Sequence, residues 1–216
     1  MTPSPILFHL ERGTLTRREW GDGHERACLL AALAPATAKS MDWRTCPAEV
    51  MPRWLAVLTP AMDDCGTVEA WEPMVRRYAD LASRWHVLDE EAWRRAFHGS
   101  LIAILEVARP HAPAVVDPVL ELLHRPVGTV TRDEWRVVRE SIKAQWATAA
   151  VKSARAAVEA VWAAAEWSAA VWAAAVLAAA GWAAAEWAAK SDAWDSMTTG
   201  ILDAIEAEIL KAEEAL

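Results

Sequence analysis

The sequence contains few of the residues that mark a disulfide-rich, collagen-like or disordered chain. Of its 216 residues only 3 are cysteine and 8 are glycine, whereas 54% are hydrophobic. Cys28, Cys46 and Cys65 are an odd number and widely spaced, so the sequence predicts three reduced thiols rather than a disulfide framework. The hydrophobic content predicts a globular chain that can bury a core.

Positive charge is also in short supply. Lysine and arginine number 22 against 30 aspartates and glutamates, which gives a formal net charge of -8. Residues 1–130 carry 17 acids and 14 bases, and residues 131–216 carry 13 acids and 8 bases, so neither half offers the basic face that duplex nucleic acid requires. The N-terminus has no basic leader and too short an apolar run for a secretory signal. We therefore expect a cytoplasmic protein that does not bind duplex nucleic acid.

Patterns of alternating apolar and polar residues, which mark strands, are almost missing. The stretch "ILFHL" near the start is the single candidate, in a minor N-terminal hairpin. Apolar residues instead recur at helical spacing, and helix starts are signalled by Asp89 and by the capping box of Thr131 and Glu134. The sequence predicts an all-α fold, a multi-helix bundle or short helical array of about seven helices.

Prolines and polar runs set the expected helix limits. Helices are expected over residues 21–34, from Pro47 with a restart at Pro52, and over 112–124 with an interruption at Pro118. The stretch "KSDAWDSMTTG" (190–200) is interpreted as a break before an amphipathic last helix, whose isoleucine face should dock on its own subunit. These limits give two regions, an N-terminal helical region over 1–130 and a region over 131–216 with a long Ala/Trp-rich helix and the C-terminal helix. We expect both to fold as one cooperative unit.

Large side chains recur every five residues in an alanine-rich stretch of the second region. They are Trp162, Trp167, Trp172, Leu177, Trp182 and Trp187. On a helix, five residues advance about 500°, so successive tryptophans wind around the axis. We interpret the stretch as the central helix, in which alanines let neighbours approach and buried tryptophans fill the gaps. A continuous helix over 131–189 would be about 90 Å long. We therefore expect either a break near "ATAAVKS" or a homo-oligomer, most simply a dimer.

Two other structures fit the same period. A pentapeptide β-solenoid places a small residue two positions before each large one, as alanine does here, but six units complete barely one coil and alanine is a poor strand former. A membrane helix is suggested by the uncharged residues 167–185, but alanine inserts weakly and tryptophan prefers the interface. Expansion of a repeated coding unit by slippage is a further origin of the period. We favour the central helix outside the membrane.

Sequence motifs of catalysis are missing. The chain has no HExxH, GxSxG, P-loop or GxGxxG motif, and we expect no catalytic residue, no metal and no cofactor. His24 and Cys28 are four residues apart, and Asp63 and Asp64 adjoin Cys65. A surface histidine above a buried cysteine and the end of a helix are the simpler interpretations of these two groups.

The best binding candidates are arginines beside aromatic residues: Arg76, Arg77, Trp93, Arg94 and Arg95. A guanidinium group can clamp a phosphate or carboxylate, and together with tryptophan it can sandwich a base, so a nucleotide ligand fits these residues. Pairing of the same arginines with nearby acids on a solvated helix face is the alternative.

The chain resembles hypothetical proteins of phages, prophages and GC-rich bacteria. The resemblance rests on "CPAEVMPRWLAVLTP", on "AWDSMTTGILDAIEAE" and on the Ala/Trp-rich second half. The alanine-rich helical end is also similar to that of immunity proteins of polymorphic-toxin loci. The resemblance implies a protein of genetic conflict in the cytoplasm of a bacterial host, such as an immunity protein or a phage anti-defence inhibitor. It carries no functional residue over to this chain.

Three functions are compatible with these observations. We favour a non-enzymatic binding protein that acts on a protein partner, because the chain combines a helical scaffold and an acidic surface with no catalytic signature. The second function is a small-molecule binding sponge for nucleotides, or an unrecognised enzyme, with an Arg/Trp pocket. The third is a structural phage component that assembles through the long helix.

Overall fold

The computed structural model describes residues 4–110, 113–126, 128–146 and 191–215. All regular structure in these ranges is helical, which confirms the all-α fold. The helices are α1 (Pro5–Glu11), α2 (Leu29–Leu33), α3 (Ala36–Ser40), α4 (Arg53–Cys65), α5 (Val68–Arg84), α6 (Glu90–Ala108), α7 (Pro113–Leu123), α8 (Arg132–Trp146) and α11 (Ser191–Glu214), with short 3₁₀ helices η1 (Trp43–Thr45) and η2 (Trp85–Val87). The tryptophans at 162, 167, 172, 182 and 187, together with Leu177, lie outside the described residues.

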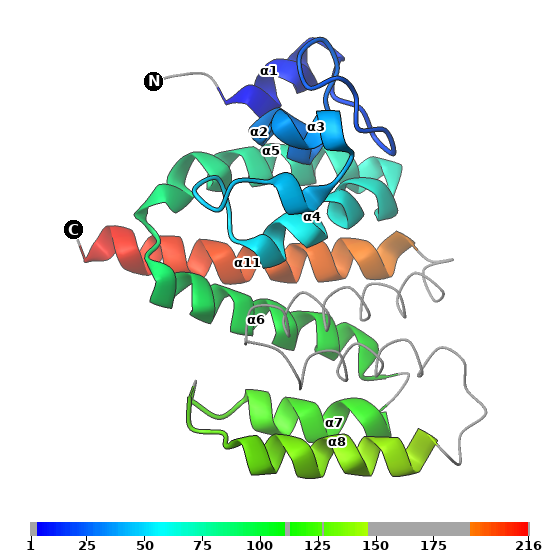
Figure 1. The fold of residues 1–216 in the computed structure, drawn as a ribbon, viewed down its shortest axis with the longest axis vertical. Coiled ribbons are helices and arrows are strands. Elements are labelled where there is room, and N and C mark those ends of the chain that lie inside the picture. Colours follow the sequence, from blue (N-terminus) through cyan, green and yellow to red (C-terminus); the bar gives the residue numbers. More distant parts are fainter. Residues whose placement is uncertain (1–3, 111–112, 127, 147–190, 216) are drawn as a thin grey trace.

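The described helices are stacked along the long axis of the molecule (Figure 1). Helices α1 to α3 lie at one end, and α4 and α5 form the next layer. Helix α11 crosses the middle, α6 follows it, and α7 and α8 lie together at the opposite end. The last helix of the sequence therefore lies between α5 and α6, which are joined in the sequence by η2.

The apolar face of α11 is buried in this central position. Ile201, Ile205 and Ile209 are each fully buried, and Trp194 and Met197 extend the buried face toward the start of the helix. The expectation that the final segment docks its isoleucines on its own chain is confirmed. Because α11 packs against α4, α5 and α6, residues of both expected regions contribute to one hydrophobic core.

Small residues let α6 and α11 approach closely. A Cβ atom added at Gly200 would lie 2.5 Å from the Cβ of Ala103, and one added at Gly99 would lie 3.0 Å from the Cβ of Ala204. Each glycine therefore faces an alanine of the other helix. At such separations any larger side chain would push the two helices apart.

An aromatic chain fills the space between α4, α5 and α6. Trp54 packs against Trp93 with ring centroids 6.1 Å apart, and Trp93 packs against Trp85 at 5.8 Å. Trp85 in turn lies edge-on to Tyr78 at 5.7 Å. Edge-on packing of this kind is the arrangement that aromatic quadrupoles favour. Trp93 is therefore part of the packing between helices. The sequence had suggested it as a binding residue because it stands next to two arginines.

Several predicted helix starts are confirmed by their hydrogen bonds. Asp89 caps α6 by accepting from the N–H of Ala92 at 2.7 Å. Thr131 and Glu134 form the capping box of α8, in which the N–H of Thr131 donates to Glu134 at 2.8 Å and the N–H of Glu134 donates to Thr131 at 3.3 Å. Helix α4 begins directly after Pro52, as the restart predicted.

The N-terminal expectations were wrong in two places. The stretch "ILFHL" lies in α1 and not in a strand, because Pro5 opens the helix at a position where a missing N–H costs nothing and Ile6 is buried on its inner face. Of the helix expected over 21–34, only α2 forms. The residues before α2 form a loop instead, in which the Asp22 carboxylate accepts from the N–H groups of His24, Glu25 and Arg26.

Three further limits were also wrong. No break separates residues 191–200 from the last helix, because Gly200 lies inside α11 and allows its contact with α6. Pro118 lies within α7 without interrupting it. Pro47 precedes a turn and not a helix, since α4 begins only at Arg53.

We predict that Gly200→Ala lowers the free energy of unfolding. Alanine is the better helix former by about 1 kcal/mol, but its Cβ would collide with Ala103, and overpacking of this kind costs about 1–3 kcal/mol. Chemical denaturation measures the change. The double variant Gly200→Ala with Ala103→Gly removes the collision and should regain most of the loss. A Gly200→Ala protein more stable than the wild type would contradict the close approach of α6 and α11.

Candidate functional site

The arginines proposed from the sequence hold carboxylates of the chain itself. Arg76 donates to Glu72 one turn earlier on α5, at 2.7 Å. Arg77 bridges from α5 to α11, where it binds Asp203 at 2.6 Å and also Glu206. Burial lowers the pKa of Arg77, but the two carboxylates outweigh burial and raise it. An anionic ligand at this place would have to displace two acids.

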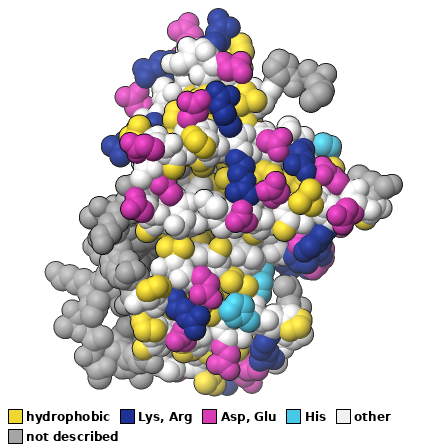
Figure 2. Space-filling model, turned by 180° about the vertical axis from the view of Figure 1, so that it is seen from behind, with side chains coloured by type: hydrophobic (Ala, Val, Ile, Leu, Met, Phe, Trp, Pro, Cys, Tyr) yellow, Lys and Arg dark blue, Asp and Glu magenta, His cyan; other side chains and the backbone are white. Residues whose placement is uncertain are grey.

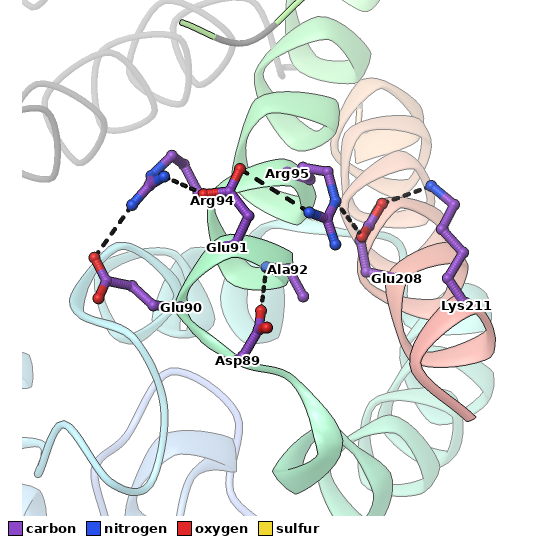
Figure 3. A network of polar contacts seen from close by, with 8 residues as sticks. All are labelled: Asp89, Glu90, Glu91, Ala92, Arg94, Arg95, Glu208 and Lys211. Atoms are coloured by element: carbon purple, nitrogen blue, oxygen red, sulfur yellow. Dashed lines mark hydrogen bonds and ion pairs between the residues drawn. The ribbon is translucent and has the colours of Figure 1, made fainter. Parts of the chain in front are cut away.

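The second arginine pair lies in a network between α6 and α11 (Figure 3). Arg94 binds Glu90 at 3.2 Å and also Glu91, so its partners belong to the first turn of its own helix. Arg95 donates to Glu208 of α11 at 2.7 Å and lies 4.0 Å from Glu91. The structure therefore places Arg94 and Arg95 beside acids and does not bring them together with Arg76 and Arg77.

Glu208 is the buried member of this network. Its side chain is only 6% exposed, and it accepts from both Arg95 and Lys211, each at 2.7 Å. Burial raises the pKa of Glu208, but the two cations outweigh burial and lower it. The ion pair of Glu208 with Arg95 consequently holds α11 to α6. Together, Arg95 and Lys211 compensate the negative charge of this carboxylate.

A small groove lies between α5 and α11. It encloses about 210 Å³, and its lining combines apolar residues with four polar or charged ones: Met62, Gly66, Ala70, Trp71, Pro73, Met74, Arg77, Asp195, Thr198, Thr199 and Leu202. Small-molecule sites usually enclose about 300–1,000 Å³, so this groove is smaller than a nucleotide site. Its size fits a single large apolar side chain. Of the arginines proposed from the sequence, Arg77 is part of the lining.

The turn between α4 and α5 shapes one end of the groove. Asp195 of α11 accepts from the N–H of Thr67 at 3.1 Å and from its hydroxyl at 2.7 Å, while the Thr67 hydroxyl caps α5 by accepting from Ala70. A side chain at Gly66 would collide with Asp195. The turn is therefore fixed to the first part of α11.

The same turn is held from the other side by Arg17. Its Nε donates to the carbonyl of Asp63 at 2.8 Å, and its terminal nitrogen donates to the carbonyl of Gly66. The carbonyl of Asp63 belongs to the last turn of α4 and that of Gly66 directly follows the helix, so both would otherwise lack helical partners. The loop before α2 is thus tied to the end of α4.

Asp63 is a buried carboxylate that orients one wall of the groove. It is 1% exposed, and it accepts from the indole Nε1 of Trp71 at 2.7 Å and from the N–H of Leu29 at 3.0 Å. Burial raises the pKa of Asp63 to about 6, against the opposing effect of these two hydrogen bonds. The interpretation that Asp63 and its neighbours end a helix is confirmed, because α4 ends at Cys65. His24 lies exposed in the loop before α2, whereas Cys28 is buried at the start of that helix.

A cluster of Trp43, Arg44 and Arg53, here called the Trp43 platform, was not selected from the sequence. The guanidinium carbon of Arg44 lies 4.7 Å from the centroid of the Trp43 ring, and that of Arg53 lies 5.4 Å from it. Both arginines are exposed. The adjacent letters "WR" at 43–44 were the only local signal, because Arg53 reaches the ring from the start of another helix.

Charges of opposite sign lie side by side on the surface. On the face shown in Figure 2, lysine and arginine side chains lie beside aspartate and glutamate side chains rather than in one continuous basic area. Among the described residues, no three His, Cys, Asp or Glu side chains form a group that could hold a metal ion. In the same part of the chain, none of the helices has the length and apolar character needed to cross a bilayer.

No protein-family model matches the chain, and no curated protein or solved structure matches it. The groove and the charged residues are therefore the features that bear on function.

We predict that Asp63 makes stability fall as the pH rises through its pKa. The folded-state pKa of about 6 lies above the ordinary value of 3.8. The folded protein therefore binds this proton more tightly, and stability gained below about pH 4 is lost as the pH rises toward 7. A shift of this size corresponds to something on the order of 3 kcal/mol.

Denaturant unfolding of the wild type and of Asp63→Asn at several pH values measures this effect. Asparagine does not titrate here and keeps one side-chain oxygen that can accept a hydrogen bond. The free energy of unfolding of the wild type should therefore rise relative to that of the variant as the pH falls from 7 to 4. Parallel curves for the two proteins would contradict the raised pKa.

Proposed function

We propose that the protein is a non-enzymatic binding protein that acts on a protein partner, with the groove between α5 and α11 as the contact site. The observation that carries the proposal is a mostly apolar groove of about 210 Å³ whose lining includes the charged residues Arg77 and Asp195. Its size suits one large side chain of a partner. An immunity protein or a phage anti-defence inhibitor in a bacterial cytoplasm would act by such a contact.

The charge around the groove favours a basic partner segment. Residues 68–77 of α5 and 192–206 of α11 together carry six acids and two arginines. Both arginines are paired with carboxylates of that same set. An excess of negative charge remains, and complementary charge steers association and selects partners. We therefore expect the groove to take an apolar side chain that is flanked by lysine or arginine.

The arrangement of the arginines favours this function over the nucleotide pocket at Arg76, Arg77, Arg94 and Arg95. Each of these four already binds at least one carboxylate. Trp93 packs between Trp54 and Trp85. A nucleotide at these residues would have to break ion pairs, three of which join helices.

Selection from a random peptide library on the purified protein tests the proposal. The selected peptides should carry a large apolar residue beside basic residues. Thr199→Arg should abolish their binding, because Thr199 is an exposed residue of the lining and an arginine adds bulk and repels a basic segment. The helix should tolerate the change, since Asp195 and Asp203 lie four residues away on either side.

Ala207→Arg is the matched control. It adds the same charge at another exposed position of α11, outside the groove lining, and should leave peptide binding unchanged. Enrichment of acidic peptides, or equal binding to Thr199→Arg and to the wild type, would overturn the proposal.

We also propose that the chain forms a homo-oligomer, most simply a dimer, through the Ala/Trp-rich stretch with Trp167 and Trp172. That stretch lies outside the described residues, and the proposal rests on its sequence. Residues 167–185 carry no charge, and soluble monomers rarely expose large apolar patches. Light scattering at micromolar concentration should give a multiple of the 23.7 kDa chain mass, and replacing both tryptophans with alanine should lower it. A monomer mass for the wild type would contradict this expectation.

A further inference from the structure

The Trp43 platform is a second charged surface, separate from the groove. We propose that it binds a phosphate-bearing ligand, with the guanidinium groups of Arg44 and Arg53 each against one phosphate group of an oligophosphate. The inference does not depend on the proposed protein contact, because none of the three residues lines the groove.

The indole ring brings the two guanidinium groups near each other. The guanidinium carbons of Arg44 and Arg53 lie 4.7 Å and 5.4 Å from the same ring centroid. The distance between the two carbons therefore cannot exceed the sum of these values. An oligophosphate can bridge such a span with one phosphate group at each arginine. A guanidinium stacked on a ring keeps its N–H edges free for oxygen acceptors, and planar donors of this kind match phosphate geometry.

Arg53 differs from the arginines chosen from the sequence. Its exposed side chain makes no ion pair or hydrogen bond with any residue that the structure describes, apart from its contact with Trp43. No acid lies in the first turn of α4, which Arg53 opens. Among the described residues, no carboxylate therefore lies within ion-pair distance of this guanidinium group, although the chain has a net charge of -8.

Asp42 is the internal competitor at the platform. Its carboxylate accepts from the N–H of Arg44 at 2.9 Å and from the Arg44 guanidinium at 3.3 Å. A phosphate group approaching Arg44 therefore meets a neighbouring negative charge. Asp42→Asn removes that charge and keeps a side-chain oxygen for the backbone N–H of Arg44.

The platform recognises phosphate oxygens and not a base. Both guanidinium groups already lie against the ring of Trp43, so a base would compete with arginine for any ring face that the two groups occupy. Ligands that share the oligophosphate group, whether a free oligophosphate or a nucleotide, should bind through it alike.

Isothermal titration calorimetry at low salt tests the inference with tripolyphosphate, inorganic phosphate and ATP as probes. Tripolyphosphate and ATP should bind the wild type with similar affinity, and inorganic phosphate more weakly. Arg53→Gln and Arg44→Gln should each weaken tripolyphosphate binding roughly tenfold, in line with the loss of one charge-assisted contact. Asp42→Asn should strengthen it.

Arg76→Gln is the matched control, since it removes an exposed arginine that already binds Glu72, and it should leave the affinity unchanged. Thr199→Arg should also leave it unchanged, which separates this site from the groove. Melting temperatures of all variants identify any loss of fold, and Asp42→Asn keeps the test decisive because it predicts a gain.

Three outcomes would overturn the inference. One is no heat of binding for tripolyphosphate with the wild type. The second is binding that survives both Arg44→Gln and Arg53→Gln, or a melting temperature lowered by these changes with the affinity unchanged, which would make the platform a purely structural contact. The third is binding of ATP without binding of tripolyphosphate, since recognition would then rest on the base.

Discussion

The contact between α6 and α11 is the constraint on which the rest of the structure depends. Gly99 and Gly200 each face an alanine of the other helix, so the two backbones lie close together. This approach places the isoleucine face of α11 in the core, where its three isoleucines are fully buried. Once α11 is fixed against α6, its other side faces α5 and forms the groove.

Ion pairs then hold α11 in its position between α5 and α6. Arg77 reaches it from α5 and Arg95 reaches it from α6, and each binds a carboxylate of α11. Exposed pairs of this kind contribute little to stability, about 0–1 kcal/mol each. Glu208 is the exception, because its carboxylate is buried and removal of a partner would leave an unpaired charge. Arg77 and Arg95 therefore act chiefly in joining helices, whereas Arg76 and Arg94 bind acids of their own helices.

The turn between α4 and α5 links the N-terminal loop to the groove. Arg17 binds the carbonyls at the end of α4, Asp63 orients Trp71, and Asp195 binds Thr67. Three separate parts of the chain thus meet at a few residues. The groove inherits its shape from these contacts, because Trp71 and Asp195 belong to its lining.

The sequence by itself determined the helical class and many helix ends, because those depend on near neighbours. The capping box of Thr131 and Glu134 and the cap at Asp89 form as predicted, since each needs only residues three positions apart. The isoleucine spacing of the last helix likewise predicted its buried face. Short-range hydrogen bonds and helical periodicity both depend on residues that are close together in the sequence, so the sequence alone predicts them.

Tertiary structure decided the rest. Gly200 looked like part of a break, and only the proximity of Ala103 gives it a place inside a helix. Arg77 and Arg95 looked like ligand contacts, and only the position of α11 shows which of its carboxylates they bind. Arg53 meets Trp43 although nine other residues separate them in the sequence. Such contacts depend on how whole helices pack. The local sequence does not predict which distant side chains this packing brings together.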